Sequence, residues 1–176
     1  MNELDRRHMM GALVAGGAAI GAAVMTPRTA QAGPVDLAMK DLKKEAEAAC
    51  VYHCDFGDPG RFSQQLRNIS NHLAVYNSDP FALKIVIVAH AAGIKFFLSD
   101  LNGTPWAEEQ IDPELNKRMK ALALSGVEVY LCRVTFTTLK IDPAKARSDS
   151  YIKFVPSGIA TAAALQGKGF AYLKVG

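Results

Sequence analysis

The run from Lys84 to Ala89 is the feature that most constrains the fold of this chain, because it is almost wholly apolar and β-branched. A strand with apolar side chains at successive positions is typical of a sheet that is covered on both faces. Four other apolar runs predict further strands, at 49–53, 127–131, 151–155 and 170–175. The chain is therefore expected to contain a buried sheet of about five strands.

Segments with helical spacing separate these runs. Apolar residues recur at helical intervals in 61–76 and 114–124, and 157–165 is predicted as a helix with Ser157 as its N-cap. Strands that alternate with helices predict an α/β fold with a mainly parallel sheet. Shorter or partial helices are predicted at 36–47, 94–98 and 140–148.

Residues 1–32 have the composition of a removable export signal. Arg6 and Arg7 precede an apolar Gly/Ala-rich stretch, which ends before the small-residue site Ala30-Gln31-Ala32. The paired arginines favour the twin-arginine route, with a Sec signal or an uncleaved anchor as alternatives. The stretch is shorter than the roughly 20 strongly apolar residues that span a bilayer. We therefore expect a periplasmic protein without a stable membrane anchor, whose single domain comprises residues 33–176.

Charge and motifs exclude several classes of function. The chain has a formal net charge of +3, part of which lies in the signal, and the basic residues form no cluster of the kind that binds nucleic acid. We find no phosphate-binding loop, dinucleotide fingerprint or serine-hydrolase elbow. No bound cofactor is therefore expected.

Residues capable of chemistry follow three of the predicted strands. His53-Cys54-Asp55 ends the first, His90 follows the second, and Cys132-Arg133 follows the third. Because ligands gather at the carboxyl ends of parallel strands, we expect these residues to share one edge of the sheet. The chain has three cysteines, so in an exported protein at least one thiol lacks an internal partner.

Five segments, in this order, resemble the DsrE/DsrF-like family: 67–72, 87–94, 126–132, 155–158 and 166–172. The resemblance implies a three-layer α/β/α sandwich that assembles as a trimer or hexamer. It also implies sulfur metabolism, in which a cysteine carries sulfur as a persulfide between a donor and an acceptor, either protein or small sulfur compound. Cys132 matches the position of that cysteine. The family's usual His-Gly-x-Gly is His90-Ala91-Ala92-Gly93 here, so the first glycine is replaced.

Each of these residues has alternative roles. Cys132 is either the persulfide-bearing nucleophile or an inert core thiol; Cys54 is interpreted as its resolving partner. His90 either assists the thiol or caps the strand end, and His53 and Arg133 are accessory candidates. His53, Cys54, His90 and Cys132 together form an alternative thiophilic metal site. The competing functions are thus a sulfur carrier or sulfurtransferase, a ligand- or metal-binding domain, and a purely structural oligomer.

Overall fold

A computed structural model describes residues 33–176, which contain a sheet of six strands, all parallel. Each strand pairs with its neighbour over two to seven residues. In spatial order the strands are β1 (Val35–Asp36), β5 (Ile152–Val155), β4 (Glu128–Cys132), β3 (Leu83–Ala89), β2 (Ala48–Cys54) and β6 (Ala171–Lys174). The expected parallel sheet is confirmed, with one strand more than predicted.

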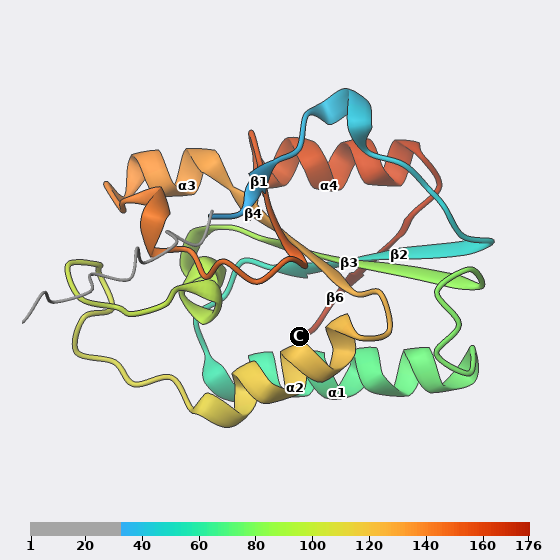
Figure 1. Ribbon diagram of the computed structural model, residues 1–176, viewed down its shortest axis with the longest axis horizontal. Coiled ribbons are helices and arrows are strands. Elements are labelled where there is room, and N and C mark those ends of the chain that lie inside the picture. Colours follow the sequence, from blue (N-terminus) through green and yellow to red (C-terminus); the bar gives the residue numbers. More distant parts are fainter. Residues whose placement is uncertain (1–32) are drawn as a thin grey trace, which may run out of the picture. The chain divides into compact units, whose positions relative to one another are not determined.

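Helices cover both faces of the sheet, which gives the expected three layers (Figure 1). One face carries α1 (Pro59–Val75) and α2 (Pro113–Ala123), which lie side by side; the other carries α4 (Gly158–Gly167). The short α3 (Arg133–Thr138) continues directly from β4. Three 3-10 helices complete the described elements: η1 (Met39–Asp41), η2 (Ala91–Phe97) and η3 (Pro143–Lys145).

The central strand β3 shows why this sequence folds into layers. Its residues Ile85 to Ala89 are at most 1% exposed. Because side chains alternate along a strand, Ile85 and Ile87 pack with α1 and α2, whereas Val86 and Val88 pack with Leu165 of α4. An apolar residue at every position is what two covered faces require.

One local prediction is wrong and one element was missed. Segment 36–47 does not form the predicted helix beyond the three-residue η1, because Val35–Asp36 pairs with β5 as an edge strand and Leu42 packs, 1% exposed, on the α4 face. Residues 133–138, for which no element was predicted, form α3. The Phe136 ring packs edge-on against Phe154 of β5 and holds this helix on the sheet. The prediction of an export signal falls on residues 1–32, outside the described residues.

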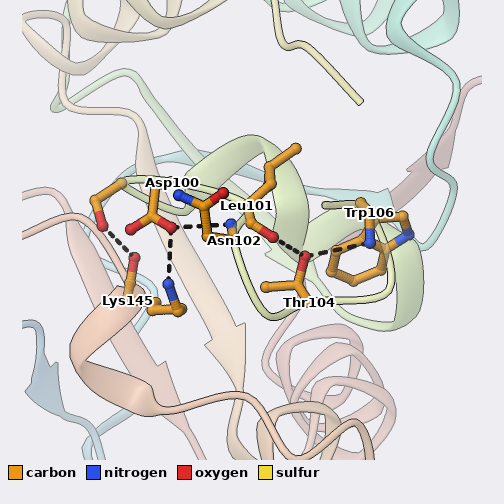
Figure 2. A network of polar contacts seen from close by, with 7 residues as sticks. Asp100, Leu101, Asn102, Thr104, Trp106 and Lys145 are labelled. Carbon is orange, nitrogen blue, oxygen red and sulfur yellow. Dashed lines mark hydrogen bonds and ion pairs between the residues drawn. The ribbon is translucent and has the colours of Figure 1, made fainter. Parts of the chain in front are cut away.

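The loop 99–112 is fixed by polar contacts within the loop and with Lys145 of η3 (Figure 2). Lys145 Nζ donates to Asp100 Oδ1 over 2.7 Å, and Thr104 Oγ1 donates to the Leu101 carbonyl over 2.7 Å. The backbone N–H of Trp106 donates to Thr104 Oγ1, and the partly buried Trp106 ring packs against the core.

Within residues 33–176, no helix is both long enough and apolar enough to cross a membrane.

Candidate functional site at the carboxyl edge of the sheet

The structure brings the three predicted strand ends together. Strands β2, β3 and β4 are neighbours, so His53, His90 and Cys132 lie at one edge of the sheet. The strands run parallel in a register that pairs Cys54 with Ala89 and Ala89 with Leu131. The predicted adjacency of these strand ends is confirmed.

The pleat sorts the site residues between the two faces. Val51 packs on the α4 face and Tyr52 on the α1 face. Alternation along β2 therefore places His53 on the α4 face and Cys54 on the α1 face. In β4, Tyr130 packs on the α4 face and Leu131 on the other, so Cys132 joins His53 on the α4 face.

Because of this arrangement, Cys54 cannot act as a resolving thiol for Cys132. The two cysteines lie on opposite faces with β3 between them. Two strand spacings correspond to about 9–10 Å, beyond the Cα separation of roughly 7 Å that a disulfide allows. All three cysteines are free and buried. Full burial also raises the pKa of the Cys54 thiol far above its usual range, which disfavours the reactive thiolate.

His90 and Cys132 both pack against Gly158, the first residue of α4. A Cβ atom on Gly158 would lie 2.9 Å from the His90 Cβ and 3.2 Å from the Cys132 Cβ. Only a residue without a side chain lets the two strand ends approach the helix this closely. Ser157 caps α4 by accepting a hydrogen bond from the Ala160 N–H. The amino end of a helix stabilises nearby negative charge, and Cys132 lies beside it.

His53 and His90 face each other directly. Their Nε2 atoms are 2.5 Å apart, and the other ring nitrogen of His53 contacts the Tyr172 hydroxyl over 2.5 Å. At such a distance one Nε2 carries the shared proton and the other accepts it, so the pair cannot be doubly charged. Burial lowers the pKa of both rings; the carboxylate of Asp55 opposes this shift, and the positive charge of Lys174 adds to it. Burial thus favours the neutral form of both histidines.

Asp55 and Lys174 complete the polar cluster. Asp55 follows β2 and accepts a hydrogen bond of 2.6 Å from Lys174 Nζ of β6. Although its burial opposes ionisation, this lysine and His53 keep the pKa of Asp55 below its usual range. Ligand atoms of His53, Asp55 and His90 all lie within 4.8 Å of one another.

The Arg133 side chain contacts the edge strand β1 and not the site residues. Its Nε and Nη2 donate to the two carboxylate oxygens of Asp36 over 2.8 and 2.7 Å, and its guanidinium lies 3.6 Å from the centre of the Phe154 ring. The side chain thus ties the first residue of α3 to the edge strand β1. Nothing in this geometry directs its charge toward Cys132.

Four residues of this edge were not predicted as site residues: Asp55, Gly158, Tyr172 and Lys174. Asp55 was noted at the end of the first predicted strand but was given no role, and the two β6 residues reach the site only because β6 pairs with β2. The sequence contains no local signal for a pairing across more than a hundred residues. Gly158 was noted only as part of a family segment, although a glycine beside a helix N-cap often marks close approach.

The fold and this edge define a class: a layered, all-parallel α/β domain with thiol and imidazole groups at the carboxyl ends of adjacent strands. The sequence matches the DsrE/DsrF-like family over residues 48–175, and the chain belongs to that family. The family implies a sulfur-relay type of role in general.

A solved structure of similar fold is the protein of unknown function MTH1491 from Methanobacterium thermoautotrophicum. It superimposes with a TM-score of 0.58 at 21% sequence identity, covering 73% of this chain and 99% of that one. A comparison with the curated proteins gave no match. At this level of identity the similarity establishes the fold.

Proposed function

We propose that this protein handles sulfur in the periplasm, carrying or transferring sulfane sulfur as a persulfide on Cys132. One observation supports the site above the others: Cys132 ends the inner strand β4 and packs with His90 against the amino end of α4. Family membership supports the class of chemistry. The location rests on the predicted export signal in residues 1–32.

The reaction is a thiol exchange. The Cys132 thiolate attacks a sulfane sulfur of a polysulfide or of thiosulfate. A new S–S bond forms at Cys132 Sγ, the donor's S–S bond breaks, and the shortened polysulfide or sulfite leaves with the electron pair. The proton lost from the thiol goes to water or to the neutral His90 nearby. No redox partner is required, because the sulfane sulfur is already at the oxidation level that it has in the persulfide.

The other two cysteines are poorly suited to this role. Cys54 is fully buried, and burial raises the pKa of both Cys50 and Cys54. Both side chains belong to the core cluster under α1 and α2. Cys132 is also buried, 4% exposed, so loading requires local opening where β4, α3 and α4 meet. We further propose that the domain acts as a homo-oligomer, trimeric or hexameric as in its family.

Sulfur loading followed by intact mass spectrometry tests the proposal. Protein purified from the periplasm is incubated with polysulfide or thiosulfate, and wild type is compared with Cys132→Ser and Cys54→Ser. We expect one added sulfur atom in wild type and in Cys54→Ser, and none in Cys132→Ser. Loading that persists in Cys132→Ser, or is absent from folded wild type with both donors, would overturn the assignment. Recovery of protein with an intact Met1 from the cytoplasm would refute the location.

A further inference from the structure

We propose that His53, Asp55 and His90 form a binding site for a divalent transition metal such as Zn²⁺. Within residues 33–176, this is the one group of at least three potential ligands whose donor atoms converge. Two imidazoles and one carboxylate are a common ligand set for zinc, with a fourth position left for water or substrate. The inference goes beyond the sulfur chemistry of Cys132 and does not depend on it.

The separations of the three donor atoms are close to those that a bound zinc ion requires. Zinc binds histidine nitrogen and carboxylate oxygen at about 2.0–2.2 Å, so two ligands at a tetrahedral angle stand about 3.4 Å apart. The three donor atoms already lie within 4.8 Å of one another, and the two Nε2 atoms are 2.5 Å apart. Binding therefore requires the facing imidazoles to separate by about 1 Å, a small side-chain rotation.

The surroundings of His53 suit a histidine that binds a metal ion. Metal-binding histidines almost always use their second ring nitrogen in a hydrogen bond that fixes the ring and its tautomer. The His53 Nδ1 makes such a bond with the Tyr172 hydroxyl, and its Nε2 points at His90. The His53 side chain is also held by β2 and is 5% exposed, so little freedom is lost on binding.

Lys174 competes with the ion for Asp55. Its ammonium group lies 2.6 Å from Asp55 Oδ2, and both side chains are partly exposed. A bound dication would take the place of this ammonium as the counter-charge of the carboxylate. Removing the lysine should therefore strengthen metal binding, an effect that loss of a merely structural ion pair would not produce.

Cys132 is outside the ligand set. It shares the contact with Gly158 but does not belong to the group of converging donors. The four-residue site predicted from sequence, with Cys54 and Cys132 as ligands, is replaced by one in which Asp55 supplies the third donor. Cys54 is excluded because its side chain lies on the opposite face of the sheet.

The test measures metal binding directly. Full-length protein, processed as the cell processes it, is stripped with chelator, titrated with Zn²⁺ against a chromophoric chelator, and analysed for metal content after dialysis. We expect one Zn²⁺ per chain in wild type. His53→Gln and His90→Gln should each weaken binding by more than the roughly 10–100-fold that loss of a supporting hydrogen bond, as in Tyr172→Phe, typically causes. Lys174→Gln should bind at least as tightly as wild type.

His72→Gln is the matched control. His72 lies on α1, contacts the Tyr52 hydroxyl at 3.2 Å and is outside the cluster, so its loss should leave Zn²⁺ affinity unchanged. Far-UV circular dichroism of each variant distinguishes loss of a ligand from loss of the fold, and Lys174→Gln retains all three ligands in any case.

Substitution with Co²⁺ identifies the ligand types. We expect d–d bands without a sulfur-to-metal charge-transfer band.

Three results would overturn the proposal. Failure of wild type to bind Zn²⁺ in competition with the chelator would leave the histidines as a hydrogen-bonded pair only. Equal weakening by His72→Gln would indicate non-specific binding. A charge-transfer band that disappears in Cys132→Ser would show that the thiol is a ligand. None of these outcomes affects sulfur loading of metal-free protein, so the two proposals can fail separately.

Discussion

Gly158 packs against Cys132 so closely that a Cβ atom on the glycine would stand 3.2 Å from the Cys132 Cβ. The same atom would lie 2.9 Å from the His90 Cβ and 3.0 Å from its Cδ2. These neighbours are held by strand ends and cannot easily move away. Gly158→Ala should therefore destabilise the protein by about 1–3 kcal/mol, the usual cost of overpacking, and should alter sulfur loading of Cys132. Urea unfolding and intact mass measure the two effects.

Gly167→Ala is the matched control for that variant. Gly167 ends the same helix and has no atom within 4 Å of the position that a Cβ would take. The substitution should be neutral or stabilise by up to about 1 kcal/mol, because alanine favours helix over glycine. Equal losses of stability in both variants would contradict the packing argument.

Ala91 is in a backbone conformation that glycine prefers. Its φ is +47°, at the position where the resemblance to the family leads us to expect a glycine. The left-handed region costs a non-glycine residue roughly 1–2 kcal/mol, and Ala91 is exposed, so its methyl group contributes little packing. Ala91→Gly should raise stability by about 0.5–1 kcal/mol once the greater freedom of the unfolded chain is subtracted. Thermal unfolding measures the change.

Ala92→Gly serves as the comparison for this effect. Ala92 lies in the same 3-10 helix, and positive φ is not among its features. This variant should lose stability, because only the entropic cost of glycine applies. If Ala91→Gly also lowers the melting temperature, the backbone strain at Ala91 is not significant.

The Arg133–Asp36 pair should contribute to structure and leave sulfur chemistry unaffected. Both side chains are partly exposed, at 33% and 69%, and exposed pairs are worth about 0.2–1 kcal/mol. Arg133→Gln should therefore lower stability slightly, with some further loss from the contact with Phe154. Its rate of sulfur loading should match wild type. A large decrease in that rate, with the fold intact, would return Arg133 to the site.

The sheet could be predicted because its signal is local. The apolar runs at β2, β3 and β4 and the helical spacing of α1 and α2 are visible in short windows of sequence. By contrast, α3 consists of Arg-Val-Thr-Phe-Thr-Thr, in which every residue after the arginine has a low helical preference, and it forms because Phe136 packs on Phe154. The two-residue β1 is too short to leave a pattern.

The site was predictable only as far as strand ends could be recognised. His53, His90 and Cys132 came from the rule that chemistry gathers at carboxyl ends. The error over Cys54 was avoidable, since neighbouring residues of a strand point to opposite faces and His53 and Cys54 cannot both face Cys132. Tyr172 and Lys174 required knowledge that β6 lies beside β2, a long-range pairing without a local signal.

Glu128 should make stability depend on acid pH. It lies between Lys84 and Lys153, at 2.9 and 2.5 Å, and accepts a hydrogen bond from the Tyr130 hydroxyl. Burial alone would raise its pKa, but the two lysines outweigh that effect and hold the pKa below the usual 4.5. A lowered carboxyl pKa adds stability that is fully present above the unfolded value and is lost as pH falls through the folded one.

The expected result is a decrease in unfolding free energy as pH falls below about 4.5, the ordinary value for glutamate. Urea unfolding at a series of pH values measures it. Glu128→Gln should be less stable than wild type at neutral pH and should lose less stability on acidification. A parallel pH profile for the two proteins would show that other carboxyl groups dominate the acid response.

Thiol alkylation should distinguish Cys132 from Cys54 in the folded protein. Cys54 is 0% exposed and its pKa is strongly raised by burial, so it should react only when the whole domain unfolds. Cys132 is 4% exposed but lies at the edge, where α3 has six residues and is the shortest α-helix described. Local opening there costs less than global unfolding, and Cys132 should react before Cys54. Peptide mapping after timed alkylation measures the order, with Cys132→Ser as the blank. Modification of Cys54 before Cys132 would contradict both the local opening and the persulfide assignment, because the sulfur donor must reach the same thiol by the same route.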